Sequence, residues 1–303
     1  MKIYILGNGF DLAHNLKTSY WDFRDYLEDT DLEYLIQLEE MYGYYPESKI
    51  SMVQDNLWKE FEYQLGEIDA ESKVDDGKDF YLGLEIEDSG VEDTLDSFWE
   101  SQYGFINQLN DYVRTWIQQI DISKVKKRRL SIKPKYQDVF LSFNYTLLLE
   151  ENYKISPGCI LHIHGSIDEN DIDPVIGHGR SDVEHKLRQS ARDASEEYDE
   201  KKESICNAMA NYIARIQKDT AHYISCNQGF WSSIHDVETV IIMGHSLGEV
   251  DMPYFDEIRK RTSVNSKWLY YFYGKEPSTS YIAEKLHISE AMLSIIPSEE
   301  FFK

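Results

Sequence analysis

The chain has 303 residues, and its 31 Lys and Arg against 55 Asp and Glu give a formal net charge of −24. Hydrophobic residues make up 42% and aromatic residues 14%, which excludes the disordered, low-hydrophobicity class of proteins and predicts a large buried core. Because an anionic surface of this size repels polyphosphates and anionic lipids, general nucleic-acid binding and electrostatic membrane binding are unfavourable.

We expect neither a membrane-spanning helix nor a signal peptide. The longest fully apolar stretches, such as Leu269–Tyr273, are far shorter than the roughly 20 residues needed to span a bilayer. The first residues, MKIYILGNGFD, lack the apolar core and the cleavage site of a signal peptide. The 3 cysteines of the chain are not spaced as CxxC. We therefore expect a cytoplasmic protein with reduced thiols and no cysteine-type zinc site.

Short apolar runs bounded by turn residues predict buried strands. They cover residues 2–6, 138–143, 159–163, 239–243, 267–273 and 292–296. Helical patterns at residues 252–261 and 280–287 separate the last three runs. Buried strands that alternate with helices are typical of a parallel sheet covered on both faces. The sequence therefore predicts a single α/β domain over residues 1–303, built on a Rossmann-like, doubly wound parallel sheet with helical insertions.

Two insertions with helical patterns interrupt this predicted core. Residues 21–136 form an acidic helical lobe, in which residues 21–100 hold 25 acidic and 5 basic residues. Residues 180–225 form a second, charged insertion. Amphipathic spacing predicts that the acidic side chains lie on solvated helix faces. A lobe that imitates the charge of DNA and binds a DNA-binding partner is the alternative interpretation.

The acidic lobe ends in a basic run, KVKKRRLSIKPK, where residues 124–135 hold seven bases and no acid. We interpret this run as a linker that neutralises the acidic lobe. A contact with phosphate or nucleic acid is the alternative interpretation.

Polar or glycine-rich motifs follow four of the predicted strands. They are Gly7-Asn8-Gly9-Phe10-Asp11, Asn144-Tyr145-Thr146, His162-Ile163-His164-Gly165, and Gly244-His245-Ser246-Leu247-Gly248 with Asp251 beyond it. The carboxyl ends of parallel strands meet at one edge of a sheet, where open α/β sheets bind their ligands. The sequence therefore predicts a ligand site at this edge.

The first motif is compatible with phosphate binding. Gly7-x-Gly9 directly after a strand is typical of a tight turn that presents backbone N–H groups and a helix N-terminus to a phosphate. The third glycine of the dinucleotide fingerprint is replaced by Leu12. Taken alone, the pattern fits a plain strand-to-helix turn equally well.

These motifs also carry a family resemblance. GNGFDLAHNLKTSYWDF at the start, FNYTLLLE at 143–150, HIHG at 162–165, IGHG at 176–179 and GHSLGEVDMPYFDEI at 244–258 together resemble the AbiH family of bacteriophage abortive-infection proteins. The resemblance lies at both ends of the predicted core and hardly extends into the helical insertions. It implies a role in phage defence and leaves the biochemical activity open.

A more distant similarity is to sirtuin-like NAD-binding domains. These share the order of a glycine-rich first loop, an Asn after a strand, a His-Gly pair and a late G-x-S-L motif, matched here by Gly7 to Gly9, Asn144, His164-Gly165, and Gly244, Ser246 and Leu247. The chain lacks the Gly-x-Pro-x-x-Arg segment and the four-Cys zinc module of sirtuin deacetylases. The similarity therefore implies NAD⁺ cleavage rather than deacetylation.

The similarity to NAD-binding domains implies a set of site residues. NAD⁺ is expected as ligand or substrate, with no metal. Asn144 would hold a ribose hydroxyl or a water, His164 would act as the base, and Asp11 would stabilise positive charge on the sugar. The expected nucleotide contacts are Gly7, Asn8, Gly9, Phe10, Gly165, Gly244, His245, Ser246 and Asp251. The expected partners are the nucleotide, a homo-oligomer and an unidentified phage or host trigger; a membrane or nucleic acid is not expected.

Other functions fit the same residues. Gly244-His245-Ser246-Leu247-Gly248 matches the G-x-S-x-G nucleophile elbow of serine hydrolases, although His287 is the sole histidine after Ser246. His162 and His164, expected on the same face of a strand, could bind a metal for phosphoester hydrolysis with His178, His245, Asp11 or Asp251. The third class is a non-catalytic nucleotide sensor or a protein-interaction module.

The concentration of negative charge in residues 21–100 generates a prediction about stability. Self-repulsion among these carboxylates destabilises the fold unless cations, the basic run or a partner offset it. We expect the melting temperature, followed by circular dichroism, to rise between low salt and about 0.1 M, where the Debye length is about 10 Å. A melting temperature that does not change over this range would mean that the charges are already compensated within the fold.

Overall fold

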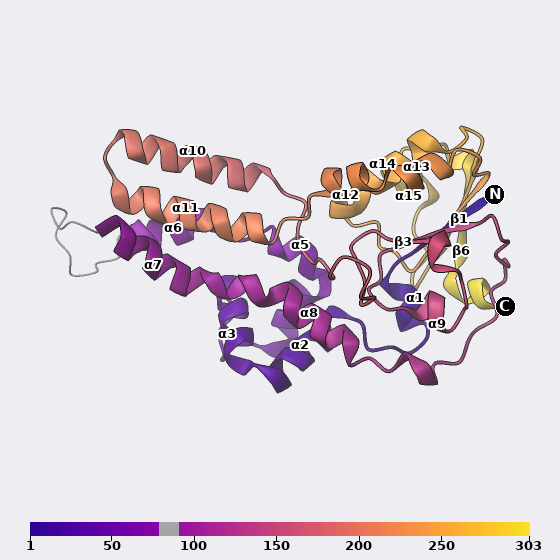
Figure 1. The fold of residues 1–303 in the computed structure, drawn as a ribbon, viewed down its shortest axis with the longest axis horizontal. Coiled ribbons are helices and arrows are strands. Elements are labelled where there is room, and N and C mark those ends of the chain that lie inside the picture. Colours follow the sequence, from indigo (N-terminus) through magenta and orange to yellow (C-terminus); the bar gives the residue numbers. More distant parts are fainter. Residues whose placement is uncertain (79–90) are drawn as a thin grey trace. The chain divides into compact units, whose positions relative to one another are not determined.

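The structure is a computed structural model that describes residues 1–78 and 91–303. The chain divides into two compact units (Figure 1). The first unit contains Met1–Phe23, Val113–Val175 and Asp219–Lys303, and the second contains Arg24–Tyr112 and Ile176–Lys218. None of the helices in the described ranges is long and apolar enough to cross a lipid bilayer.

The first unit is built on a six-stranded sheet in which every strand pairing is parallel. The strands are β1 (Lys2–Leu6), β2 (Val139–Ser142), β3 (Ile160–His162), β4 (Thr239–Met243), β5 (Lys267–Phe272) and β6 (Leu293–Pro297). Their order is β3-β2-β1-β4-β5-β6. The predicted α/β class and parallel sheet are confirmed. The chain order reverses between β1 and β4, which makes the carboxyl ends of these two strands the switch point of the sheet.

Successive side chains of each strand point to opposite faces of the sheet, and both faces are buried. On β1, Ile3 and Ile5 belong to one apolar cluster, whereas Tyr4 and Leu6 belong to the other. Full burial of such a side chain contributes about 1.5–3 kcal/mol. Because side chains on both faces are buried, the central strands appear in the sequence as continuous apolar runs.

Helices cover both faces of the sheet. The face of Ile3 packs against α12 (Thr220–Cys226), α13 (Gln228–Ser233), α14 (Met252–Arg261) and α15 (Thr279–Lys285). The opposite face packs against α1 (Asn8–Leu12), α9 (Leu148–Glu151) and the C-terminal turn Ser298–Phe302. The strands and these helices therefore hold the loops that follow β1, β2, β3 and β4 at one edge.

The second unit is helical. It contains α3 (Leu32–Met41), α4 (Ile50–Asn56), α5 (Phe61–Leu65), α6 (Ala70–Lys78), α7 (Val91–Tyr103), α10 (Asp182–Glu196) and α11 (Glu200–Arg215). Helices α2 (Tyr20–Thr30) and α8 (Leu109–Gln118) contain points where the chain passes between the units. Helix α11 packs against α6, α7 and α10, and its side chains Ile205, Met209 and Ile213 are fully buried.

The limits of the helical unit differ from those of the expected insertions. Residues 113–136 and 219–225 belong to the first unit. The reason is apolar packing, since Ile122 and Leu130 bury their side chains against one face of the sheet and Tyr223 packs against the other. The second unit nevertheless carries 33 acidic and 13 basic residues, a net charge of −20 out of −24.

Two bases of the run 124–135 are bound within the first unit. The guanidinium of Arg128 lies 3.9 Å from the ring centroid of Phe302 and donates a hydrogen bond to the backbone oxygen of Ala13. Lys127 donates to the backbone oxygen of Tyr153. These two side chains therefore attach the run to the sheet unit.

A buried carboxylate joins the starts of β1 and β2. Asp138 is 1% exposed and accepts hydrogen bonds from the backbone N–H groups of Lys2 and Lys135, and each bond is 2.8 Å long. The ammonium group of Lys2 lies 3.7 Å from the same carboxylate. Asp138 thereby fixes how β1 and β2 begin side by side.

We expect Asp138→Ala to lower the free energy of unfolding by about 2–3 kcal/mol, because it leaves two N–H groups without their charged acceptor. Urea denaturation measures this change. Glu238→Ala is the matched control, since the carboxylate of Glu238 is 84% exposed in its ion pair with the N-terminus and should contribute little. Equal effects of the two substitutions would contradict the role of Asp138.

Candidate functional site

The loops after β1 and β2 are joined through the buried carboxylate of Asp11. Asp11 is 1% exposed and lies in α1. Its Oδ1 accepts a hydrogen bond of 3.0 Å from Nδ2 of Asn144, and its Oδ2 accepts one of 2.6 Å from the hydroxyl of Thr146. Burial raises the pKa of Asp11 to about 7, and these two hydrogen bonds only partly oppose that rise. We call Asp11, Asn144 and Thr146 the Asp11 network.

Asn144 has one side-chain atom that the protein does not satisfy. Because the amide nitrogen of Asn144 donates to Asp11, the amide oxygen Oδ1 points away from that carboxyl group. Within residues 1–78 and 91–303, this buried Oδ1 has no hydrogen-bond partner. A buried acceptor left without a donor costs about 1–3 kcal/mol. Oδ1 of Asn144 is therefore a candidate contact for a donor group of a ligand.

His162 extends this arrangement to α9. Its Nδ1 lies 2.8 Å from the backbone oxygen of Asn144, and its Nε2 lies 2.8 Å from Oε1 of Glu150. Burial opposes protonation of His162, but the hydrogen bond and charge of Glu150 outweigh burial, so the pKa of His162 lies above its ordinary value. His162 therefore holds the backbone of Asn144 in place through an ion pair with Glu150.

The loops after β3 and β4 meet at a second buried carboxylate. Oδ2 of Asp251 lies 3.2 Å from Nε2 of His245, and Oδ1 lies 3.7 Å from Nε2 of His164. The backbone N–H of Leu247 donates to Nδ1 of His245, which places the ring proton of neutral His245 on the nitrogen that faces Asp251. Nε2 of His164 also lies 3.1 Å from the hydroxyl of Tyr254. We call these four side chains (His164, His245, Asp251 and Tyr254) the Asp251 network.

The Asp251 network has the components of an acid–base site. The imidazole of His164 lies within hydrogen-bond distance of the phenol of Tyr254, which can orient it, whereas the carboxylate of Asp251, at 3.7 Å, acts on it through its charge. His164, His245 and Asp251 are each less than 10% exposed, so their electrostatic interactions are only weakly screened by water. Phe143 packs edge-on against the rings of His164 and His245, which fixes their positions.

The glycines of the first and fourth loops hold these loops against each other. The N–H of Gly7 donates to the backbone oxygen of Met243, and that of Gly9 donates to the oxygen of Gly244. A Cβ atom on Gly9 would lie 2.6 Å from Cα of Gly244, and Gly244 itself has a φ of +71°. Side chains are excluded from this contact because backbone packs directly on backbone.

The sequence had suggested that these glycines present N–H groups to a phosphate. In this structure the N–H groups of Gly7 and Gly9 donate hydrogen bonds to backbone oxygens of the protein. The amide of Asn8 donates to the backbone oxygen of Thr18, and Phe10 is buried in the apolar cluster beside α9. A Cβ atom on Gly165 would lie 2.3 Å from the backbone oxygen of Ile172. Direct contact of these residues with a nucleotide stays a prediction.

The fourth loop differs from a serine nucleophile elbow. In such an elbow the serine occupies the strained position of the turn. Here the side chain of Ser246 is exposed, and the neighbouring buried Leu247 has the positive φ of 58°. Among the described residues, no hydrogen bond joins Ser246 to a histidine. His287 is instead 3.0 Å from Asp256.

The expectation that His162 and His164 share a face is wrong. His162 contacts α9, which covers one face of the sheet, whereas His164 contacts Tyr254 of α14, which covers the other. The reason is that β3 ends at His162, so the alternation of a strand does not extend to His164. Over the described ranges, no group of three or more His, Cys, Asp or Glu side chains is arranged to hold a metal ion.

Sequence reasoning missed Thr146, Glu150 and Tyr254 as members of the site. All three lie inside motifs that the sequence analysis quoted. Tyr254 follows Asp251 by three residues, a spacing that places two side chains on one side of a helical turn. Thr146 and Glu150 carried no comparable signal, because their partners, Asp11 in α1 and His162 in β3, lie in other elements of the chain.

The raised pKa of Asp11 predicts how stability depends on pH. Between the unfolded value near 4 and the folded value of about 7, the native state binds more protons than the unfolded state, so stability falls as pH rises. Relative to Asp11→Asn, which does not titrate, the wild type should lose on the order of 2 kcal/mol between pH 5 and 7.5. Urea denaturation at each pH measures the difference. Parallel curves for the two proteins would contradict the assignment.

Comparison with known proteins gives one family. A family model described as Bacteriophage abortive infection AbiH matches residues 3–273. The match spans segments of both units and strands β1 to β5. No curated protein and no solved structure matches the chain.

Proposed function

The chain belongs to the AbiH family of bacteriophage abortive infection proteins, and from this premise we propose that it is a phage-defence protein that binds and hydrolyses NAD⁺ or a related nucleotide. The proposed site is the carboxyl edge of the sheet, formed by the Asp11 and Asp251 networks. The strand order supports this location, since 3-2-1-4-5-6 is the order of the doubly wound folds that bind dinucleotides beside the switch point. A Rossmann-like, and more specifically sirtuin-like, fold is part of the proposal.

The observation that carries the proposal is the unsatisfied Oδ1 of Asn144. A ribose hydroxyl, or a water held beside the ribose, would supply the missing donor. Both oxygens of Asp11 are used by Asn144 and Thr146, so we assign Asp11 the task of positioning Asn144 instead of contacting the sugar. The carboxylate fixes which way the amide faces, and thereby presents an acceptor to the ligand.

The Asp251 network supplies the proposed base. In the hydrolysis of NAD⁺, the bond between C1′ of the ribose and the nicotinamide nitrogen breaks, and its electron pair goes to nicotinamide. Water forms the new bond to C1′, and its proton passes to His164. Asp251 stabilises the imidazolium that results, and Tyr254 orients the ring. Released products are ADP-ribose, nicotinamide and a proton.

Residues outside the two networks are assigned to nucleotide contact according to whether their side chains are exposed. The loop after β4 presents the exposed hydroxyl of Ser246, which we propose contacts the nucleotide and does not act as a nucleophile. The glycines of the first and fourth loops shape the site by bringing the two loops together. The proposal places the protein in the cytoplasm, where it would act on the cellular NAD⁺ pool.

We expect His164→Ala to reduce NAD⁺ hydrolysis by roughly 10²–10⁴-fold, as loss of a general base does. Asn144→Ala should reduce it as well, and His185→Ala, which changes an exposed histidine of α10, should not. The measurement is NAD⁺ and ADP-ribose in cells that express each variant during phage challenge. Unchanged NAD⁺ in cells that the wild type protects would exclude depletion, and bound but uncleaved NAD⁺ would indicate a sensor.

Ser246→Ala separates the nucleotide hypothesis from the serine-hydrolase alternative. Under the proposal this variant binds the nucleotide more weakly but retains turnover at saturating substrate. If Ser246 were the nucleophile, the Ser246→Ala variant would be inactive at every substrate concentration. Steady-state kinetics therefore decides between the two. Loss of activity on addition of a chelator would instead favour the metal-dependent alternative.

A further inference from the structure

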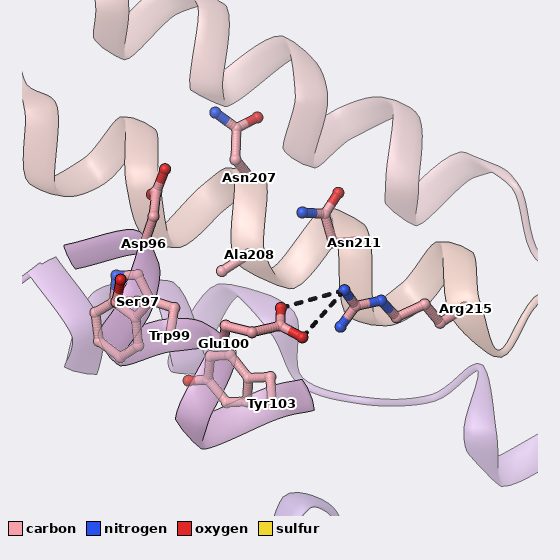
Figure 2. Close-up of a pocket in the computed structure, with 9 residues that line it drawn as sticks. All are labelled: Asp96, Ser97, Trp99, Glu100, Tyr103, Asn207, Ala208, Asn211 and Arg215. Carbon is pink, nitrogen blue, oxygen red and sulfur yellow. Dashed lines mark hydrogen bonds and ion pairs between the residues drawn. The ribbon is translucent and has the colours of Figure 1, made fainter. Parts of the chain in front are cut away.

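A groove with a volume of about 350 Å³ lies within the second unit, between helices α7 and α11 (Figure 2). Its size falls in the lower part of the range of ligand pockets, roughly 300–1,000 Å³. Helix α11 contributes Asn207, Ala208 and Asn211, and α7 contributes carboxylates and aromatic rings. The small side chain of Ala208 leaves the space between the two helices open (Figure 2).

The two amides on α11 have the spacing of an extended peptide. Asn207 and Asn211 lie four residues apart on one helix, so they are separated by about 6 Å along its axis. Alternate residues of an extended chain repeat about every 6.6–6.8 Å. A carboxamide carries both a donor and an acceptor, which match the C=O and N–H of a peptide unit. We propose that this groove binds an extended, basic peptide segment of a partner protein.

The hydrogen bonds of the amides leave them available. Oδ1 of Asn211 accepts a hydrogen bond of 2.8 Å from Arg188, which orients the amide and leaves its nitrogen as a donor. Asn207 also lines the groove, and among the residues drawn in Figure 2 its side-chain amide makes no hydrogen bond. The amide of Asn211 thus joins α11 to Arg188 of α10 through its oxygen, and neither amide is hydrogen-bonded to the described residues of α7 across the groove.

The opposite wall selects a positive charge. Asp96 and Glu100 lie one turn apart on α7. Glu100 is paired with Arg215, whose nitrogen lies 3.2 Å and 3.4 Å from the two carboxylate oxygens. Asp96 accepts a hydrogen bond from the hydroxyl of Ser204 and has no ion pair among the described residues. Its charge, within a unit of net charge −20, favours Lys or Arg and disfavours a nucleic-acid backbone.

The wall formed by α7 also accommodates the stem of such a side chain. The rings of Trp99 and Tyr103 are nearly parallel, at an interplanar angle of 9° with centroids 5.8 Å apart. Long basic side chains pack their methylene groups on apolar surface and place the charge at its edge. The partly buried ring of Tyr103 can add a cation–π attraction for Lys or Arg, whereas the ring of Trp99 is only 5% exposed. The groove thus offers amides for the peptide backbone and a carboxylate for its side chains.

The test uses the full-length protein and a library of acetylated, amidated heptapeptides with Lys at every second position and random residues between. Peptides retained by the immobilised wild type are identified by mass spectrometry, and the affinity of the most enriched peptide is measured by fluorescence polarisation. We expect Asn207→Ala combined with Asn211→Ala to weaken binding about tenfold, because the variant loses the hydrogen bonds of both amides to the peptide backbone. Asn56→Ala, at an exposed position of α4, is the matched control and should bind normally.

Two further measurements separate peptide recognition from simple charge attraction. The same peptide with N-methylated backbone nitrogens should lose affinity, because it cannot donate to the amide oxygens. Asp96→Asn, which keeps an acceptor for Ser204, should weaken the Lys peptide but not a Gln-substituted version of it. Equal binding by the wild type and the Asn207→Ala/Asn211→Ala variant, no retained peptide, or a preference for a library with Glu in place of Lys would overturn the proposal.

Discussion

The contact on which the site depends is the direct packing of the loop after β1 against the loop after β4. Gly7 and Gly9 approach Gly244 so closely that a Cβ atom on any of the three would overlap backbone atoms. Two hydrogen bonds from the first loop to the carbonyl groups of residues 243 and 244 close the contact. It exists because β1 and β4 are paired neighbours in the sheet and their carboxyl ends finish at the same level. Asp11 and His245 reach one edge of the sheet as a consequence.

Two buried carboxylates at that edge have different surroundings and therefore different chemistry. Asp11 is bound by an amide and a hydroxyl, neither of which carries a charge, and burial raises its pKa. Asp251 lies between two imidazoles, which can become positively charged beside it. A carboxylate with neutral donors orients its partners, whereas a carboxylate between imidazoles can stabilise a proton that a histidine has accepted. Under the proposed function, the Asp11 network positions the ligand and the Asp251 network transfers the proton.

The second unit differs from the first in both composition and organisation. Its sequence carries a net charge of −20, and the ion pair of Arg24 with Glu39 is a point where an acidic side chain is buried. Trp58 donates to the same carboxylate, so that this charge is doubly bound. Other acidic side chains in the described part of this unit, such as those of Asp55 and Glu100, are exposed. A surface of this charge attracts basic macromolecules and repels nucleic acid.

The sequence by itself determined the class of the fold and brought the polar and glycine-rich motifs to one edge of the sheet. The limits of β1, β4 and α14 could be predicted to the residue, because burial on both faces requires uninterrupted apolar runs and a helix requires its own period. Tertiary structure alone decided which polar groups meet. Asp11 and Asn144 are 133 residues apart, and their hydrogen bond depends on strand register and loop packing that no local pattern encodes. The same holds for Tyr254 beside His164, for the separation of His162 from His164, and for the return of residues 113–136 to the sheet unit. Local patterns report how each residue is buried, whereas hydrogen-bond partners are set by distances across the folded chain.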